Sequence, residues 1–161
     1  MIPVVIPGYR RLFNLRAEHY RSSNRLGRAP IENGAMNVEP DPAASFNGLA
    51  FRVTEVELEI LDARERYYLR LVAPAHDFDT RELVGEGHFY SAAVDAEWLE
   101  RDPGRLLPLW RDIVWARRGA YAIGEAFGRY FDETTYLADG RTRVVDHYAN
   151  LLEDLHGPLG A

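Results

Sequence analysis

The chain has 161 residues, of which 47% are hydrophobic, and it carries a formal net charge of −6. This size predicts a single domain over residues 1–161 with a buried core, and the negative charge argues against generic binding to nucleic acid or anionic membranes. Cysteine is absent and all 19 basic residues are arginine, which excludes disulfides, thiol nucleophiles, thiolate metal sites and the lysine chemistry of Schiff bases and phosphate-binding loops.

The N-terminal segment combines a strand pattern with a block of positive charge. Residues 1–15 predict one or two strands, with a kink near Pro7-Gly8. Residues 10–28 contain six arginines and a single acid. Such a block predicts either a polar segment that faces solvent or a positive rim that attracts a small carboxylate ligand.

The next stretch has less regular patterning. Residues 16–47 have no sustained apolar period and are rich in Gly, Pro, Asn and Ser, which predicts a loop interrupted by a short strand at 34–38. The EPDPAA segment at 39–44 is typical of a turn. Residues 48–53 then alternate apolar and polar side chains, as in a half-buried strand.

A helix is predicted to start directly after this strand. Thr54 and Glu57 have the spacing of a capping box, in which the side chain of each residue binds the backbone N–H of the other. Leu58, Leu61 and Glu65 follow at spacings of three and four, which places them on one face of the helix. The pattern therefore predicts a carboxylate that points inward, in line with two leucines.

Glu65 is the strongest candidate for chemistry on the basis of this periodicity. Burial would raise the pKa of its carboxyl group and suit it to proton transfer near neutral pH. The alternative is a buried ion pair with Arg52 or Arg70 from a neighbouring strand. Asp62 and Arg66, four residues apart, have the spacing of a surface pair.

The second half of the chain predicts two more strands followed by helices. A long amphipathic helix is expected over 109–131, either continuous or broken near Gly119, with Gly124 and Gly128 allowing close packing against the sheet. The Asp-Gly pair at 139–140 is typical of a turn. The other expected elements are a buried strand at 67–72, a polar connection at 74–82, a strand at 83–94, a short helix at 95–100 capped by Asp95, and a final helix at 144–155.

The order of these elements indicates the fold class. Strands, a helix, further strands and further helices follow one another without a regular alternation of strand and helix. This order predicts an α/β (α+β) fold with a small, mixed, largely antiparallel and barrel-like sheet. One helix follows the second or third strand, and the remaining helices lie toward the C-terminus.

Common catalytic and cofactor-binding patterns are missing from the sequence. It contains no GxSxG elbow, no glycine-rich dinucleotide fingerprint and no Walker loop, and Ser91 has no recognisable histidine partner. His76, Asp77 and Asp79 could hold a cation, although an exposed polar loop explains them better. No apolar run reaches membrane-spanning length and no secretory signal pattern opens the chain, so we expect a cytoplasmic location.

The GLAF segment at 48–51 and LDARERYY at 61–68 together resemble the γ-glutamylcyclotransferase-like (AIG2/ChaC-like) superfamily. In that family a strand of type G-x-x-Y/F leads into a helix ending in LDxxE and then into a tyrosine-containing strand. PVVIPGYRRLFN resembles the family's second strand, GAMNVEPDP its third strand and PLWRDIVWARRGA a later helix, so the resemblance covers residues 3–125. The family's first strand, which ends in Tyr-Gly-Ser-Asn/Leu, has no counterpart in residues 1–161, which begin at what resembles the second strand. Two alternatives follow: the segment lies upstream of Met1, or the protein lacks this donor loop.

The resemblance implies the fold of that family and a reaction that needs no cofactor. The family's glutamate takes a proton from the α-ammonium group of a γ-glutamyl compound, whose freed amine attacks its own γ-carbonyl. The glutamate then protonates the departing amine, and 5-oxoproline is released. Glu65 matches this glutamate, Tyr90 matches a ligand-lining tyrosine, and Trp110 stands in place of another. Tyr9 and Arg10 complete the expected substrate-binding set.

Three functions are compatible with these observations. In the first, the protein is a γ-glutamyl cyclotransferase, of acyltransferase or lyase type, that acts on a small γ-glutamyl substrate without metal or cofactor. In the second, it is a catalytically impaired relative that binds a small carboxylate ligand or a protein, for instance a second copy covering the sheet edge left by the missing strand. In the third, a salt bridge holds Glu65 and no cleft exists.

Overall fold

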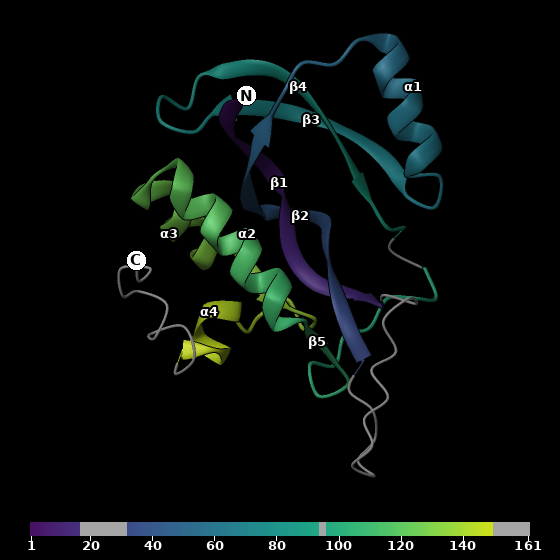
Figure 1. The fold of residues 1–161 in the computed structure, drawn as a ribbon, viewed down its shortest axis with the longest axis vertical. Coiled ribbons are helices and arrows are strands. Elements are labelled where there is room, and N and C mark those ends of the chain that lie inside the picture. The colour runs from purple at the N-terminus through teal and green to yellow at the C-terminus, as the bar shows by residue number, and fades with distance from the viewer. Residues whose placement is uncertain (17–31, 94–95, 150–161) are drawn as a thin grey trace.

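A computed structural model describes residues 1–16, 32–93 and 96–149. The predicted N-cap Asp95 and the end of the predicted C-terminal helix lie outside these residues. The elements are β1 (Ile2–Arg16), β2 (Glu32–Ala50), α1 (Glu55–Arg64), β3 (Leu69–Asp77), β4 (Leu83–Ser91), β5 (Leu106–Pro108), α2 (Trp110–Ile123), α3 (Glu125–Glu133), β6 (Thr135–Leu137) and α4 (Val144–His147) (Figure 1).

One mixed sheet organises the fold. Its strand order is β4-β3-β1-β2-β5, and β6 pairs with β1 off this path. The β1–β2, β1–β3 and β3–β4 pairs are antiparallel, whereas β5 and β6 add in parallel. The α+β class and the largely antiparallel sheet are confirmed. The barrel-like expectation is wrong, because over the residues that the structure describes the sheet stays open, with β4 and β5 at its edges.

The β1–β2 pair is longer than predicted, and an irregularity interrupts it. The pairing runs from Pro7 opposite Ser45 to Tyr9 opposite Pro40, so four residues of β2 bulge out at this point. Gly8, with φ of 84°, lies opposite the bulge, which confirms the predicted kink. The predicted turn at 39–44 is therefore wrong: the extra residues bend a continuous 19-residue strand and do not end it.

Two strand expectations need correction in extent and burial. The strand predicted at 48–53 ends at Ala50, and Phe51 is exposed. The strand predicted as buried, now β3, carries exposed Leu69 and Val72. The causes differ: Phe51 follows the last residue of β2 and is outside the sheet, whereas Leu69 and Val72 belong to the outer hairpin of the sheet.

Strand β1 separates two hydrophobic cores. Because side chains alternate along a strand, Val5 faces helices α2 and α3, whereas Val4 and Ile6 face the β3–β4 hairpin. The helix-side core consists of Val5, Phe78, Ala120, Phe127 and Phe131. The hairpin-side core consists of Val4, Ile6, Ala73 and Ala75, with Tyr9, Phe46, Ala50 and Phe89 packed against them.

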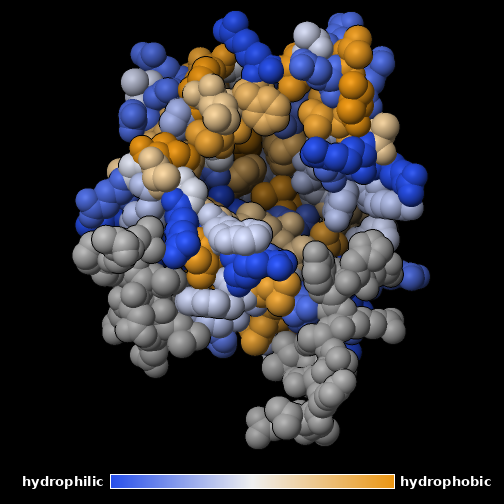
Figure 2. Space-filling view, in the orientation of Figure 1, coloured by the Kyte–Doolittle hydropathy of each residue, from blue (hydrophilic) through white to orange (hydrophobic). Residues whose placement is uncertain are grey.

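The β3–β4 hairpin arches over β1 and β2. Its ladder to β1 covers only Val4 opposite Asp77 and Val5 opposite His76. At the other end of the hairpin, the Ser91 hydroxyl donates a hydrogen bond to a carbonyl oxygen of β2. Between these two attachments this face of the molecule is hollowed over β1 and β2, and apolar residues form the floor (Figure 2).

The helix predicted over 109–131 is two helices. Gly124, with φ of 164° and ψ of 157°, is in an extended conformation that ends α2 and starts α3. The break is at Gly124 and not near Gly119. Gly128 does permit a close approach, but its neighbour is the Tyr121 ring of α2 and not the sheet, because the break folds α3 back against α2.

The close contact of Gly128 with the Tyr121 ring can be tested with a matched pair of glycine substitutions. A Cβ atom on Gly128 would lie 2.4–2.6 Å from atoms of the Tyr121 ring, whereas one on Gly119 would meet nothing within 4 Å. We expect Gly128→Ala to lower the free energy of unfolding by about 1–3 kcal/mol through overpacking. Gly119→Ala should instead raise it by about 0.5–1 kcal/mol through helix propensity. Urea denaturation measures both, and a Gly128→Ala protein as stable as Gly119→Ala would contradict the close packing.

The short elements of the second half were predicted poorly. No helix forms over residues 96–100, and β5 and β6 were not predicted, because three-residue strands leave no readable period. The turn at Asp139-Gly140 is confirmed: the Asp139 carboxylate accepts hydrogen bonds from the backbone N–H groups of Arg141 and Thr142, and Gly140 has φ of 64°.

Candidate functional site

Helix α1 begins as its sequence predicts. The Thr54 hydroxyl accepts a hydrogen bond from the Glu57 N–H at 3.3 Å, and the Glu57 carboxylate accepts one from the Thr54 N–H at 2.7 Å. This capping box is confirmed. The helix ends at Glu65, whose N–H donates to the Leu61 carbonyl at 2.9 Å. The first and last turns thus determine where the Glu65 side chain leaves the helix.

The inner face of α1 lies against the β3–β4 hairpin and carries two carboxylates. The half-buried residues at the predicted spacing are Leu58, Leu61 and Glu65, together with Asp62. The Tyr90 hydroxyl donates to the Asp62 carboxylate at 2.7 Å. Arg70 forms an ion pair with the other oxygen of Asp62 at 3.0 Å.

The predicted surface pair of Asp62 with Arg66 is therefore wrong. Helical spacing makes the pair geometrically available, but Asp62 turns toward the hairpin, where Arg70 and Tyr90 stand directly opposite each other on β3 and β4. Arg66 instead donates to the Tyr67 hydroxyl at 2.8 Å. A long-range strand register thus outcompetes a local pair that contributes only a few tenths of a kcal/mol.

Glu65 lies in the same neighbourhood. Its side chain is 25% exposed and forms an ion pair with the adjacent Arg64 at 2.8 Å, not with either strand arginine considered for it. Burial and then the Glu65 charge raise the pKa of Tyr68. Burial and the hydrogen bond to Asp62 raise the pKa of Tyr90, with a smaller contribution from Glu65. The charge of Glu65 therefore contributes to the pKa of both phenols.

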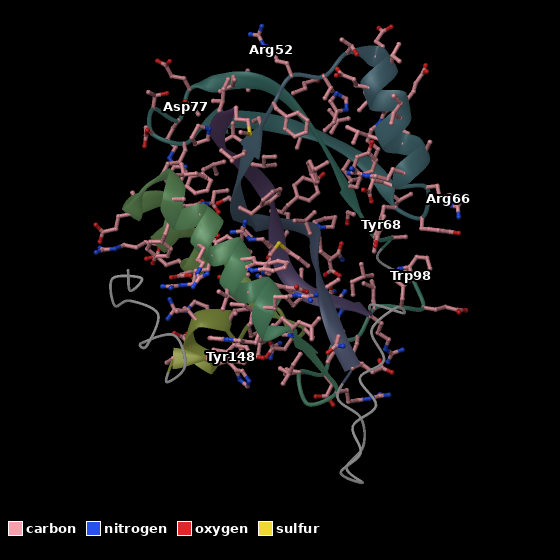
Figure 3. The ribbon with its side chains drawn as sticks, in the orientation of Figure 1. Arg52, Arg66, Tyr68, Asp77, Trp98 and Tyr148 are labelled. Carbon is pink, nitrogen blue, oxygen red and sulfur yellow. The ribbon has the colours of Figure 1, made fainter. Side chains whose placement is uncertain are left out.

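The turn after α1 presents Tyr68 to this group. The Tyr68 N–H donates to the Glu65 carbonyl at 2.8 Å. Tyr68 lies on the side of the turn nearer the sheet, while Arg66 points away from the body of the molecule (Figure 3).

We call Asp62, Glu65, Tyr68, Arg70 and Tyr90 the acid–tyrosine cluster. Two carboxylates suit an ammonium group, and the guanidinium suits a carboxylate. The phenols can donate hydrogen bonds to a carbonyl oxygen, and a carboxylate within reach of an amine can exchange protons with it. The cluster is therefore chemically suited to an amino-acid-like ligand.

The other predicted site residues lie elsewhere. Tyr9 packs edge-on against Phe89 with ring centroids 4.9 Å apart. Since Phe89 and Tyr90 are consecutive strand residues, their side chains point to opposite faces of the hairpin. Tyr9 is therefore on the arch side, away from the cluster. Trp110 starts α2, with its ring 5.7 Å from that of Tyr148.

Arg10 is engaged by residues outside the cluster. It donates to the Gly140 carbonyl at 2.7 Å, forms an ion pair with Asp41 and lies 5.4 Å from the Tyr136 ring centroid. These contacts tie β1 to the bulge of β2 and to the turn after β6. Of the five predicted site residues, the structure brings together only Glu65 and Tyr90.

The predicted cation candidate is a structural turn. The Asp77 carboxylate accepts hydrogen bonds from the backbone N–H groups of Asp79 and Thr80, and these bonds help lower its pKa. His76 Nδ1 lies 3.0 Å from the Arg81 carbonyl oxygen. Over residues 1–16, 32–93 and 96–149, no group of three or more His, Asp or Glu side chains could hold a metal ion.

Sequence patterns missed the buried charges on the helix side of the sheet. Arg11, in the block predicted to face solvent or form a rim, is only 5% exposed. Arg117 and Asp132 pair between α2 and α3. The only sequence signal for the burial of Arg11 was its position within an apolar strand. The Arg117 pair depends on the break at Gly124, which periodicity did not reveal.

No protein-family model matches the sequence, and no curated protein matches it. The chain is similar to the solution structure of At5g39720.1 from Arabidopsis thaliana, with 19% sequence identity and a TM-score of 0.43 over 98% of this chain and 77% of that chain. In the part of the chain that the structure describes, every helix is too short or too polar to cross a membrane.

Proposed function

We propose that the protein is a γ-glutamylcyclotransferase-like enzyme that releases 5-oxoproline from γ-glutamyl amines or peptides, with Glu65 as the general acid/base. The observation that carries the proposal is the acid–tyrosine cluster, in which Asp62 binds Tyr90 and Arg70 and the half-buried Glu65 lies on the same face of α1. The sequence resemblance around LDARERYY supports the same assignment.

The chemistry requires one proton-transfer group because the nucleophile belongs to the substrate. In this mechanism Arg70 holds the α-carboxylate, and Asp62 and Glu65 hold the α-ammonium group. Glu65 accepts a proton from the ammonium, and the freed nitrogen attacks the γ-carbonyl carbon to close the ring. The bond from this carbon to the leaving amine then breaks, and Glu65 returns the proton to the departing nitrogen.

The γ-carbonyl oxygen gains negative charge in this step and needs hydrogen-bond donors. The family supplies them from its Tyr-Gly-Ser loop, for which this sequence has no counterpart. We propose that the Tyr68 and Tyr90 hydroxyls supply such donors from within residues 1–161. Removing one such donor from an enzyme typically costs about 10²–10³ in turnover, so the phenols are essential to the proposed reaction.

The test is 5-oxoproline release from γ-glutamyl amines, amino acids and peptides. We expect Glu65→Gln to lower the rate by about 10²-fold or more, since the amide cannot accept the proton. Glu55→Gln, on the exposed first turn of the same helix, is the matched control and should keep the wild-type rate. Equal rates for wild type and Glu65→Gln, or no release by the wild type from any of these substrates, would contradict the enzyme assignment.

A second candidate is a catalytically impaired relative that binds a small γ-glutamyl or carboxylate ligand. Its supporting observation is that the charged groups of the cluster already have partners within the protein: Glu65 with Arg64, and Asp62 with Arg70 and Tyr90. Calorimetry would then detect ligand binding that Arg70→Gln abolishes, without 5-oxoproline release. Turnover would reject this candidate in favour of the enzyme.

A further inference from the structure

The outer face of α1 carries an apolar stripe. Val56, Ile60 and Ala63 lie at spacings of four and three, and Tyr67 continues the stripe four residues later in the turn after the helix. The side chains of Val56, Ile60 and Tyr67 are 65%, 63% and 64% exposed. A surface helix normally has polar residues on its outer face. The opposite face of α1 contacts the hairpin. The apolar stripe on the outer face is therefore left uncovered.

Apolar atoms are visible on the surface over α1 (Figure 2). Phe51, just before the helix, and Leu69, just after its turn, are also exposed. Where exposed apolar side chains form a contiguous patch, the patch usually marks an interaction site.

The charges that flank the stripe are segregated along the helix. Glu57 and Glu59 flank its first half, and Arg64 and Arg66 flank its second half. In a pair of helices that pack along such a stripe, the flanking positions decide partner and orientation. A parallel pair of α1 helices would set glutamate against glutamate and arginine against arginine.

An antiparallel pair has the opposite result. It packs Ile60 against Ala63 of the other copy and Val56 against Tyr67 of the other copy. The same register brings Glu57 toward Arg64 of the other copy, and Glu59 toward Arg66 of the other copy. The charges of α1 are thus complementary to those of a second α1 related by a two-fold axis.

We propose that the outer face of α1 is the interface of a homodimer in which two α1 helices pack antiparallel. Two helices of about 15 Å bury less than the roughly 1,000 Å² of a specific interface, so Phe51 and Leu69 must also be covered. The dimer is therefore reversible and concentration-dependent. Asp62 and Glu65 lie on the opposite face of α1, so the proposal is independent of the catalytic one.

Sedimentation velocity over a range of protein concentrations tests the interface. We expect the wild type to shift from monomer to dimer as concentration rises, and Ile60→Glu to weaken the dimer at least tenfold. Trp115→Glu on α2 is the matched control, because Trp115 is equally exposed, at 62%, on a different helix. Because both residues are exposed, neither change should alter the thermal unfolding midpoint by more than a few degrees, which circular dichroism checks.

Charge exchange tests the antiparallel orientation. Glu59→Arg and Arg66→Glu should each weaken the dimer, and the double variant should restore it, because the exchanged pair regains opposite signs. A wild type that stays monomeric at every concentration would overturn the proposal and leave this face to a different partner. A dimer weakened by Trp115→Glu but not by Ile60→Glu would also overturn it, and a double variant weaker than both single variants would reject the antiparallel arrangement.

Discussion

Asp132→Ala is expected to lower the free energy of unfolding by about 3–5 kcal/mol, because it leaves the buried Arg117 charge without its carboxylate. Arg117 is only 7% exposed and binds both oxygens of Asp132, with its Nε 2.9 Å from one and its Nη2 2.9 Å from the other. The Tyr121 hydroxyl donates to the same carboxylate at 2.8 Å. One carboxylate therefore joins α3 to two residues of α2.

Urea denaturation of three variants separates this effect from a general loss of surface charge. Arg129→Ala breaks the exposed pair of Arg129 with Glu125 on the same helix, and should change stability by at most about 0.5 kcal/mol. The double variant Arg117→Met, Asp132→Leu should recover much of the loss, because it removes both charges and keeps apolar volume. If Asp132→Ala lowered the free energy of unfolding no more than Arg129→Ala, the contacts of Asp132 with Arg117 and Tyr121 would be unimportant for stability.

Arg11→Ala is expected to destabilise the protein by about 2–4 kcal/mol. Arg11 donates to the main-chain and side-chain oxygens of Asn47, both at 2.8 Å, and to the Thr135 hydroxyl at 2.9 Å. Its guanidinium also lies 4.1 Å from the centroid of the Phe131 ring. Removing it leaves two buried oxygens of Asn47 without this donor and opens a cavity, and each lost partner costs about 1–3 kcal/mol.

The Arg11 charge itself works against part of this stabilisation. Burial lowers the pKa of the guanidinium, so the folded state holds the charged form at a cost. Arg11→Met, which keeps apolar volume and removes the charge, should therefore lose less stability than Arg11→Ala. Arg105→Ala, on an exposed arginine paired with Glu100 at 3.4 Å, is the surface control and should be nearly neutral. Chemical denaturation decides the order, and a neutral Arg11→Ala would contradict the structural role of these hydrogen bonds.

The two faces of α1 connect the two proposals without making them depend on each other. The inner face presents Asp62 and Glu65 to the hairpin, and the outer face presents the stripe from Val56 to Tyr67. We expect the Glu65→Gln protein to dimerise as the wild type does. We expect the Ile60→Glu protein to keep its 5-oxoproline activity. Enzyme assays at concentrations above and below the dimer transition measure whether association affects turnover.

The structural features that depend only on neighbouring residues could be predicted from the sequence. The capping box of Thr54 and Glu57 and the inward spacing up to Glu65 need only a few consecutive residues, and both occur in the structure. The kink at Pro7-Gly8 needs only the local preferences of two residues. The α+β class follows from the order of such local signals.

The contacts between residues far apart in the sequence became known only from the tertiary structure. Asp62 binds Arg70 and Tyr90 and not Arg66, because the register of β3 and β4 sets those two side by side. Arg11 is buried because a threonine 124 residues further along the chain completes its hydrogen bonds. Local patterns decide where a helix starts and which way a side chain leaves it, because those energies arise within one turn. Long-range packing decides which partners a charged side chain meets. It therefore also decides which residues belong to the candidate site and which face of α1 stays uncovered.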